Sequence, residues 1–370
     1  MRREARDAML PFLTEVYANP SSVHALGSAA RCAVEDARGR VATLIGARPS
    51  EVVFTSGGSE ANNLAVQGAV NAAGPGAIVT TAIEHASVRD AVAYLARTGH
   101  PVEEVAVDRL GRVDVDALRA ALRRPVTLVS VGWANNEVGT IQPIEEISAL
   151  CQARGVTLHV DAVQAAGKLP LSVRGIDLLS LSAHKLGGPK GIGALFARSG
   201  IPLRPLVHGG GQERGVRSGT ENVPGIVGMG EACRLAPESG PARAERLVAA
   251  REALWAGLVR EIPDMTRNSP AGADCLPNTL NVSVAGVRGE VLVAALDLAG
   301  IAISAGSACA AGAGEPSHVL LGMGRDVDAA RDGVRFSFGW SNTDDEIEHV
   351  VAATAAAVAR IRTSARRGAG

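Results

Sequence analysis

Lysine is scarce in this sequence of 370 residues. Among its 37 basic residues only three are lysines, Lys168, Lys185 and Lys190, which leaves 34 arginines (37 minus 3). Arginine stays protonated, whereas a lysine amine can lose its proton when partly buried and form a Schiff base with an aldehyde. The three lysines are therefore either surface residues left over by a compositional bias or residues retained because an amine is needed.

Aromatic residues, long apolar runs and an excess of one charge are lacking too. Aromatic residues make up 3% of the chain and hydrophobic residues 46%, so the core must be aliphatic. The net charge of -1, without a long block of like charge, argues against nucleic-acid or membrane-surface binding. No apolar run approaches the roughly 20 residues that span a bilayer, and the first residues lack the apolar stretch of a signal peptide. We therefore expect a cytoplasmic protein.

Paired cysteines are lacking as well. The five cysteines form no Cys-x-x-Cys pair, so the sequence indicates neither a disulfide framework nor a structural zinc site. Cys151 and Cys233 lie in apolar segments, where we expect them to be buried. Cys309 lies in a run of small residues, 304–316, that can hardly pack and should be mobile. A cysteine in such a segment is placed to visit a site and leave it.

The chain is long for a single domain, and its pattern changes along its length. Between residues 51 and 197 short β-branched runs alternate with helical patterns, which predicts an α/β fold with a mostly parallel seven-stranded sheet sandwiched by helices. The expected strands are 52–54, 77–81, 102–107, 126–131, 156–160, 176–181 and 192–196, and the clearest helices are 87–97 and 144–154.

From about residue 241 the pattern is that of a smaller α+β domain. Its expected elements are helices 244–261, 289–299 and 344–361 and strands 279–284, 301–304 and 333–338, and we expect the tail after Arg362 to be disordered. The predicted domains are a large one at 15–243 and a small one at 244–370 that includes residues 1–14.

Polar residues cluster where the predicted strands end. Residues 55–60, Thr-Ser-Gly-Gly-Ser-Glu, follow a strand and open a helix, so they form either a phosphate cradle to which Ser59 adds a hydroxyl or an ordinary serine N-cap. Asp161 and Gln164 follow one strand, and Ser182, His184 and Lys185 end the next. Ligands of α/β proteins bind at this edge of a sheet, and such a set of groups suits a charged heterocycle.

Taken together, these motifs resemble the cysteine desulfurases, in the class V aminotransferase group of fold-type I pyridoxal phosphate enzymes. The similarity covers nearly the whole chain, in order, and is carried by Asn19-Pro20-Ser21-Ser22-Val23-His24, Ser56-Gly57-Gly58-Ser59-Glu60, Glu84-His85, Asn135-Asn136-Glu137-Val138-Gly139, His159-Val160-Asp161-Ala162-Val163-Gln164, Ser182-Ala183-His184-Lys185, Gly209-Gly210-Gly211-Gln212-Glu213-Arg214, Arg217-Ser218-Gly219-Thr220 and Gly306-Ser307-Ala308-Cys309.

The resemblance implies a role for each residue around the cofactor. Lys185 would hold pyridoxal phosphate as a Schiff base, and Asp161 would pair with the pyridinium nitrogen so that the ring can act as an electron sink. Gln164 would bond the phenolic oxygen, and His85 would stack on the ring face. The remaining contacts would be Asn136 beside the ring, and at the phosphate Ser59, Ser182 and His184, with Thr220 reaching across from a second subunit of a homodimer.

The resemblance also implies the substrate and the reaction. Arg335 matches the position that binds a substrate carboxylate, for which a planar bidentate donor suits. The thiolate of Cys309 would take sulfur from L-cysteine, leaving L-alanine and a persulfide for a sulfur-acceptor or iron–sulfur scaffold protein. The long Gly/Ala loop around Cys309 resembles the subgroup that carries its persulfide outward to a protein.

The sequence departs from the family pattern at two places. Family members usually begin with a strand and an Asp-Asn-Ala-Ala-Thr-Thr-Pro-like segment that forms one wall of the substrate site, whereas residues 2–11 here resemble the helix that follows it. Ser59 stands where threonine is more usual, and it keeps the hydroxyl. Two alternatives follow: another class V enzyme, such as a selenocysteine lyase or an aminotransferase, or a homologue impaired by loss of the first segment.

Overall fold

The computed structural model describes residues 1–236, 240–306 and 315–368. The chain divides into two compact units, which are considered separately. The larger unit contains residues 1–105, 115–133 and 143–240, and the smaller unit contains residues 106–114, 134–142 and 241–370. None of the helices in the described ranges is long and apolar enough to cross a membrane.

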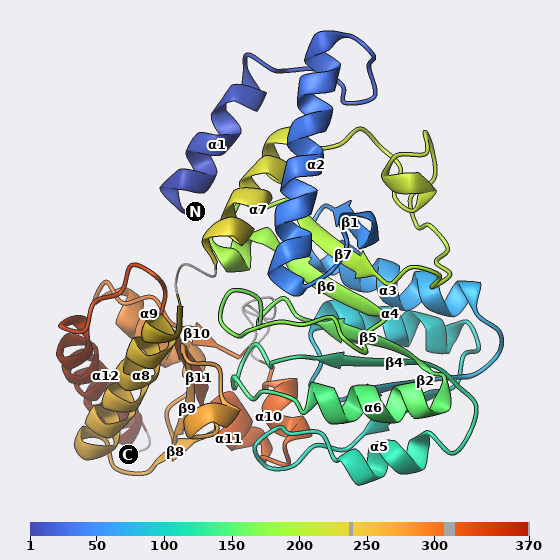
Figure 1. Ribbon diagram of the computed structural model, residues 1–370. Helices are drawn as coiled ribbons and strands as arrows, with labels where there is room; N and C mark the ends of the chain where they lie inside the picture. Colours follow the sequence, from blue (N-terminus) through green and yellow to red (C-terminus); the bar gives the residue numbers. More distant parts are fainter. Residues whose placement is uncertain (237–239, 307–314, 369–370) are drawn as a thin grey trace. The chain divides into compact units, whose positions relative to one another are not determined.

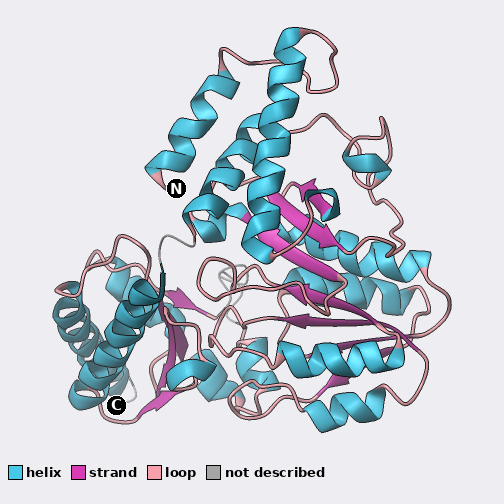
Figure 2. Ribbon diagram, in the orientation of Figure 1, coloured by secondary structure: helices cyan, strands magenta, loops and turns pink. Residues whose placement is uncertain are grey.

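The larger unit is an α/β layered structure (Figures 1 and 2). Its strands are β1 (Val52–Thr55), β2 (Ala77–Thr81), β3 (Val102–Val105), β4 (Val126–Gly132), β5 (Thr157–Asp161), β6 (Leu178–Ser182) and β7 (Gly193–Ala197). Its helices are α1 (Arg3–Leu13), α2 (Ala25–Ile45), α3 (Gly58–Ala72), α4 (Ala86–Arg97), α5 (Val115–Ala121), α6 (Ile144–Arg154) and α7 (Val223–Leu235), with short 3-10 turns η1 (Pro49–Glu51), η2 (Ala183–Leu186) and η3 (Glu213–Gly215).

The seven strands form one sheet in the order β1-β7-β6-β5-β4-β2-β3. Strand β7 pairs antiparallel with both β1 and β6, and the other pairs are parallel. Strands β2 and β6 are buried at every position, because a sheet covered by helices on both faces has no exposed side. The predicted fold class is confirmed, and the order of strands brings the ends of β4, β5 and β6 together.

The smaller unit has its own antiparallel sheet of four strands in the order β10-β11-β9-β8. The strands are β8 (Met265–Arg267), β9 (Thr279–Val284), β10 (Ser304–Ala305) and β11 (Gly333–Ser337). Its helices are α8 (Gly240–Glu261), α9 (Gly289–Asp297), α10 (His318–Gly322), α11 (Val327–Arg331) and α12 (Glu346–Gly368), with the 3-10 turn η5 (Gly272–Asp274). A separate aliphatic core, which includes Leu258, Val282, Leu292 and Val334, holds this unit together.

Residues 1–14 belong to the larger unit, so their assignment to the small domain is wrong. Helix α1 packs on α7, where a side chain at Gly228 would come within 2.7 Å of Met9 Sδ. The backbone of Arg2 also donates to the carbonyl of Gly187 at 2.8 Å. An amphipathic helix next to a chain end takes whichever apolar surface the fold offers, which its own sequence does not specify.

Two other predicted elements differ from the structure. The segment 301–303 is not a strand, because the Ile301 backbone N–H bonds to the Leu296 carbonyl and closes α9. The tail after Arg362 is helical as far as Gly368, and Thr363 Oγ1 donates to the Ala359 carbonyl at 2.8 Å. Alanine and arginine are strong helix formers, so a composition that resembles a disordered tail here continues a helix.

Candidate functional site

Asp161 lies at the end of β5 with its carboxylate held on both oxygens. Asn62 Nδ2 donates to Oδ2 at 2.7 Å, and the Val163 backbone N–H donates to Oδ1 at 2.9 Å. Burial raises the pKa of Asp161, while these two bonds and the charges of His85 and Lys185 act in the opposite direction. A side chain that is only 9% exposed thus presents a hydrogen-bonded carboxylate, which suits a partner that carries a positive charge.

Asn62 and Ser87 connect this carboxylate to His85. The same Asn62 nitrogen donates to Ser87 Oγ at 2.8 Å, and Ser87 Oγ lies 2.7 Å from His85 Nδ1. The Ser87 backbone N–H also donates to Nδ1 at 3.1 Å, which makes His85 the N-cap of α4. Because Nδ1 accepts an N–H, the ring proton of the neutral imidazole resides on Nε2. The polar groups that follow β2 and β5 therefore form one hydrogen-bonded set.

Sequence reasoning assigned no role to Asn62. Asn62 is 1% exposed and lies within the second turn of α3, where asparagine is unfavourable for a helix. Its Oδ1 is buried and has no hydrogen-bond partner among the described residues, a cost of about 1–3 kcal/mol. The orphaned oxygen shows that the amide is oriented by its two donor bonds. A buried asparagine in a helix interior was the available signal.

The sequence also did not indicate the protonation state of Glu84. Its side chain is 5% exposed and accepts a hydrogen bond from Thr81 Oγ1 at 2.7 Å. Burial, with the nearby charge of Asp161, raises the pKa of Glu84 to about 8. The raised pKa favours the neutral acid of Glu84 at pH 7, which limits the repulsion between these two neighbouring carboxyl groups.

The N-terminus of α3 forms an anion cradle with the end of β6. Gly58 lies so close to its neighbours that an added Cβ would come within 2.8 Å of Val163 Cγ2 and 3.3 Å of Ser182 Cβ. Ser59 follows in the first turn, where N–H groups have no intrahelical acceptor. Ser182 Oγ lies 2.9 Å from His184 Nδ1, which joins two of the predicted phosphate contacts. A helix N-terminus with hydroxyls beside it suits a phosphate group.

Lys185 lies directly after the β6 strand, in the turn η2 (Ala183–Leu186). Its side chain is exposed, and its charge acts on both Asp161 and His184. Burial lowers the pKa of His184, and the charges of all three lysines lower it further. Gly187 ends the turn in the left-handed region at φ 83°, which favours glycine. The structure therefore places the amine near the carboxylate and the cradle, as the strand ends predicted.

Gln164 and Lys168 lie on one turn after β5. Lys168 Nζ donates to the Gln164 backbone carbonyl at 2.6 Å and to Gln164 Oε1 at 3.2 Å. Both side chains are half-buried, whereas Lys190 is exposed. The sequence selected Gln164 by resemblance and left Lys168 without a role.

Thr220 lies exposed in the loop between η3 and α7. This loop is held by Arg217, which forms an ion pair with Glu60 at 2.9 Å, and by Gln212, whose Oε1 accepts from the Gly219 backbone N–H at 2.8 Å. Gly219 has φ 114°, a conformation that glycine alone adopts readily. The hydroxyl of Thr220 is therefore available on the surface of the larger unit.

Asn136 and Arg335 belong to the smaller unit, where they contact each other. Arg335 Nη1 donates to the Asn136 carbonyl at 2.6 Å, and Nη2 donates to Ser304 Oγ at 3.2 Å. Burial lowers the pKa of Arg335, and the neighbouring Glu137 carboxylate raises it. Glu137 is fully buried and accepts from Ser317 Oγ at 2.6 Å. The two predicted substrate residues are thus brought together across 199 positions of sequence.

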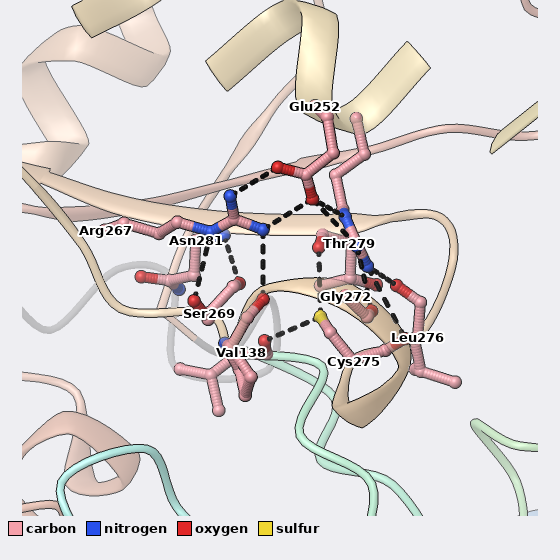
Figure 3. A network of polar contacts seen from close by, with 11 residues as sticks. Val138, Glu252, Arg267, Ser269, Gly272, Cys275, Leu276, Thr279 and Asn281 are labelled. Carbon is pink, nitrogen blue, oxygen red and sulfur yellow. Dashed lines mark hydrogen bonds and ion pairs between the residues drawn. The ribbon is translucent and has the colours of Figure 1, made fainter. Parts of the chain in front are cut away.

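A buried scaffold supports the segment that carries Asn136 (Figure 3). Arg251, which is 0% exposed, donates to the carbonyls of Gly272 and Leu276 at 3.1 and 2.7 Å. The loop that these bonds order then pairs with the Asn136 segment, because the Leu276 N–H donates to the Gly139 carbonyl at 2.7 Å. Cys275 Sγ donates to the carbonyl of Val138. The scaffold therefore reaches within two residues of Asn136.

The cysteines of the described residues are free thiols, and Cys309 lies outside those residues. Cys151 and Cys233 are each 1% exposed, as expected for structural cysteines in apolar segments. Burial raises the pKa of both thiols to about 12, so neither is a nucleophile at neutral pH. Cys32 is exposed.

The residues of the larger unit fit pyridoxal phosphate. The cradle at Gly58 leaves no room for a side chain, the Ser182 hydroxyl lies beside it, and Ser59 follows in the first turn of α3. Asp161 offers a buried carboxyl group for a protonated ring nitrogen. The Lys185 amine supplies the group that an aldehyde requires. A fold of this topology with these groups at its strand ends defines a pyridoxal phosphate enzyme of fold type I.

Comparisons with known proteins agree with this assignment. The model of the family "Aminotransferase class-V" matches residues 2–350. Cysteine desulfurase IscS of Dictyoglomus turgidum is 41% identical over 367 residues, covering 98% of this chain and 93% of the relative. A cysteine desulfurase of Cereibacter sphaeroides is 48% identical over 354 residues, covering 94% and 90%.

Solved structures show the same similarity. A NifS-like protein superposes with a TM-score of 0.91 at 37% identity, covering 97% of this chain and 96% of the other. SspA in complex with cysteine gives a TM-score of 0.80 at 36% identity, covering 91% and 95%.

The chain therefore belongs to the class V aminotransferase family of pyridoxal-phosphate-dependent enzymes. Within that family it is a cysteine desulfurase, as its relatives at 41–48% identity over nearly the full chain are.

Proposed function

We propose that this enzyme removes sulfur from L-cysteine, with Lys185, His85 and Cys309 as its catalytic residues, and passes the sulfur to an acceptor protein. Pyridoxal phosphate, when bound, supplies an electron sink that weakens bonds at the α- and β-carbons of an amino acid. The observation that carries the proposal is the Asp161 carboxylate, buried and held by two donors, with the Lys185 amine acting on it.

Each residue of the larger unit has a defined task. Asp161 would keep a proton on the cofactor's ring nitrogen, and its bonds to Asn62 and Val163 hold the carboxyl group in place. His85 would stack on the cofactor ring, with the imidazole proton on Nε2 because Ser87 occupies Nδ1. Gln164 would donate to the phenolic oxygen. The α3 N-terminus, Ser59, Ser182 and His184 would bind the phosphate.

The smaller unit supplies the substrate contacts. Arg335 binds the substrate carboxylate, and its bond to the Asn136 carbonyl orients the guanidinium. Asn136 would be a further contact for the bound cofactor. The Glu137 carboxylate opposes the effect of burial on the pKa of Arg335, which favours the cation that an anionic substrate group requires.

Cys309 is the sulfur acceptor of the first half-reaction. Its thiolate attacks the substrate sulfur, an S–S bond forms, and the carbon–sulfur bond breaks with its electron pair remaining on carbon. A proton added at that carbon gives L-alanine, and Cys309 keeps the persulfide. The solved relative described as a complex with cysteine supports cysteine as the substrate.

The test is an assay of the purified full chain reconstituted with pyridoxal phosphate. We expect a visible cofactor band, and alanine and sulfide release from L-cysteine with dithiothreitol present. Lys185→Ala should lose the band that reports bonding to the amine, and Cys309→Ala should lose sulfide release but keep the cofactor. Cys32→Ala, at an exposed cysteine of the larger unit, is the control and should retain full activity.

Two results would contradict the proposal. Absence of the cofactor band would exclude a pyridoxal-phosphate-dependent activity. Cofactor binding together with full activity of Cys309→Ala would favour an aminotransferase.

We further propose that the enzyme is a homodimer in which Thr220 reaches the phosphate of the other subunit. The exposure of Thr220 on a glycine-supported loop supports this role. A group of exposed apolar side chains at the end of α1 and the start of α2 offers a surface for the second subunit: Leu10, Leu13, Tyr17, Val23 and Leu26.

A further inference from the structure

Lys168 is half-buried and contacts Gln164, the residue four positions before it. Its ammonium lies 2.6 Å from the Gln164 backbone carbonyl and 3.2 Å from Gln164 Oε1. Lys185 is the lysine proposed to bond to the cofactor aldehyde, and Lys190 is exposed on the glycine-rich turn after it. The Lys168 side chain thus contacts another residue of the proposed cofactor site.

The contact determines which way the Gln164 amide faces. An ammonium group can only donate hydrogen bonds, so the atom of the amide that faces it must be the oxygen. The amide nitrogen, with its two hydrogens, is then left on the opposite side of the group. A deprotonated phenolic oxygen can only accept, and therefore requires that nitrogen.

The turn that carries Gln164 and Lys168 packs against the turn that carries Lys185. Gly167, at φ 72°, lies so close to Leu186 that an added Cβ would come within 2.6 Å of Leu186 Cδ2. The Lys168 backbone N–H donates to the Ala165 carbonyl at 3.0 Å, which closes the turn. The turn that carries Gln164 and Lys168 is therefore held in place against the turn that carries Lys185.

We propose that Lys168 is a positioning residue that holds Gln164 with its amide nitrogen directed at the phenolic oxygen of bound pyridoxal phosphate. The inference deepens the proposed function and rests on it. A compact ammonium can donate to the backbone carbonyl and the side-chain oxygen of a residue one helical turn away, whereas the planar guanidinium of arginine is longer and holds its donors in a rigid fork. This geometry accounts for a lysine at this position in a chain that has 34 arginines and only three lysines.

Lys190 provides a matched control for the loss of charge. Lys190 and Lys168 both lower the pKa of His184 by their charges, after the larger effect of burial. Lys190→Met therefore removes a cation that acts on the same histidine, and it leaves Gln164 in place.

The test is a pH titration of the absorbance of the bound cofactor, with the cofactor dissociation constant measured on the same samples. Lys168→Met should shift the titration midpoint upward by about half a pH unit to one unit, because the phenolic oxygen loses a well-aimed donor. We expect it to weaken cofactor binding by about three- to tenfold. Lys190→Met should leave both quantities within error, and Lys168→Arg should restore only part of the shift.

A double-mutant cycle with Gln164→Ala separates positioning from charge. If Lys168 acts through Gln164, Lys168→Met should have little further effect in the Gln164→Ala background. Equal shifts for Lys168→Met and Lys190→Met, or additive effects in the cycle, would overturn the proposal.

The cofactor-free protein distinguishes this inference from the proposed function. The Gln164 side-chain NH₂ resonances, assigned with Gln164→Ala, should move in Lys168→Met and remain in place in Lys190→Met. Absence of any cofactor band would refute the proposed function and leave this measurement intact. Unmoved resonances in Lys168→Met would refute the positioning role even in an active enzyme.

Discussion

At the scale of the residue, the environment of Asp161 determines its charge. Burial alone would favour the neutral acid, and the donors Asn62 and Val163 favour the carboxylate. Neighbouring Glu84 accepts from Thr81 Oγ1 and from the Gly132 backbone, yet burial and the charge of Asp161 raise its pKa to about 8. Burial raises the pKa of both acids, and for Asp161 the charges of His85 and Lys185 oppose that shift.

Asn62→Ala should weaken cofactor binding. The substitution removes the donor to Asp161 Oδ2 and raises the pKa of that carboxyl, so the ring nitrogen loses part of its counter-charge. A hydrogen bond to a charged group contributes about 1.5–3 kcal/mol, which corresponds to about a 10- to 100-fold rise in the cofactor dissociation constant. Titration of the cofactor-free protein with pyridoxal phosphate measures it.

Gln67→Ala is the control on the same helix, because Gln67 contacts Asn63 and no residue of the Asp161 set. An unchanged cofactor dissociation constant for Asn62→Ala would mean that the bond to Asp161 contributes to the packed core and not to cofactor binding.

At the scale of the element, a buried polar ladder crosses three strands of the large sheet. His159 on β5 lies 2.8 Å from Ser130 Oγ on β4 and 2.9 Å from Ser180 Oγ on β6. His159 is 0% exposed, and burial lowers its pKa to about 3. The folded protein therefore keeps this ring neutral over a pH range in which the unfolded chain would protonate it.

This ladder predicts a pH-dependent contribution to stability. Between pH 6.5 and about 3 the unfolded state binds more protons at this position than the folded state, so stability falls as the pH falls through that window. The loss is at most about 1.4 kcal/mol per pH unit. The free energy of unfolding of His159→Gln, which cannot take up a proton, should approach that of the wild type as the pH is lowered from 7.5 to 4.

Urea denaturation of the cofactor-free proteins at a series of pH values measures this difference. A gap between the two proteins that does not change with pH would show that His159 titrates alike in both states.

Helix α8 and the loop after β8 form a second element whose stability depends on one buried cation. Arg251 satisfies the carbonyls of Gly272 and Leu276, and Glu252 accepts from both Arg251 and Arg267 (Figure 3). Removing the guanidinium takes a donor from each of these carbonyls and leaves Leu276 with the longer bond from the Thr279 backbone N–H at 3.4 Å. This scaffold supports the segment of Asn136, so its loss affects substrate contacts as well as folding.

Arg251→Met should lower the free energy of unfolding by about 3–5 kcal/mol. Arg260→Met, on the same helix, removes an arginine whose side chain is 72% exposed and should cost less than about 1 kcal/mol. Thermal unfolding followed by circular dichroism compares the two variants. Equal losses would show that the buried bonds of Arg251 contribute no more than a surface ion pair.

At the scale of the whole molecule, the division into units does not follow the order of the sequence. The segments 106–114 and 134–142 belong to the smaller unit although residues of the larger unit flank them on both sides. Periodicity could not show this, because each segment is short and has no regular pattern of its own. Asn136 is consequently held by Arg335 of its own unit, which no local motif indicates.

The proposed dimer gives a prediction at this scale. Tyr17 and Val23 are 80% and 96% exposed. Apolar surface in contact with water is unfavourable in free energy, and burial against a second copy would remove that cost. Tyr17→Asp with Val23→Asp should convert the dimer to a monomer in sedimentation velocity at micromolar concentration. Leu298→Asp is the control, because Leu298 is a 90% exposed apolar residue elsewhere on the chain. A wild-type protein that sediments as a monomer would contradict the proposed dimer.

The sequence by itself determined the fold class and the strand ends, and it indicated most of the groups proposed for the site, because strand and helix periods and short motifs are local properties. Lys185, Asp161 and Ser182 could be named because each terminates or follows a predicted strand.

The tertiary structure alone decided which residues support the residues proposed for the site. Asn62 meets Asp161 across 99 positions and Arg335 meets Asn136 across 199, and only the packed chain brings such groups within hydrogen-bond distance. The same holds for the pKa values of Glu84 and His159, because burial depends on what the rest of the chain packs around each group.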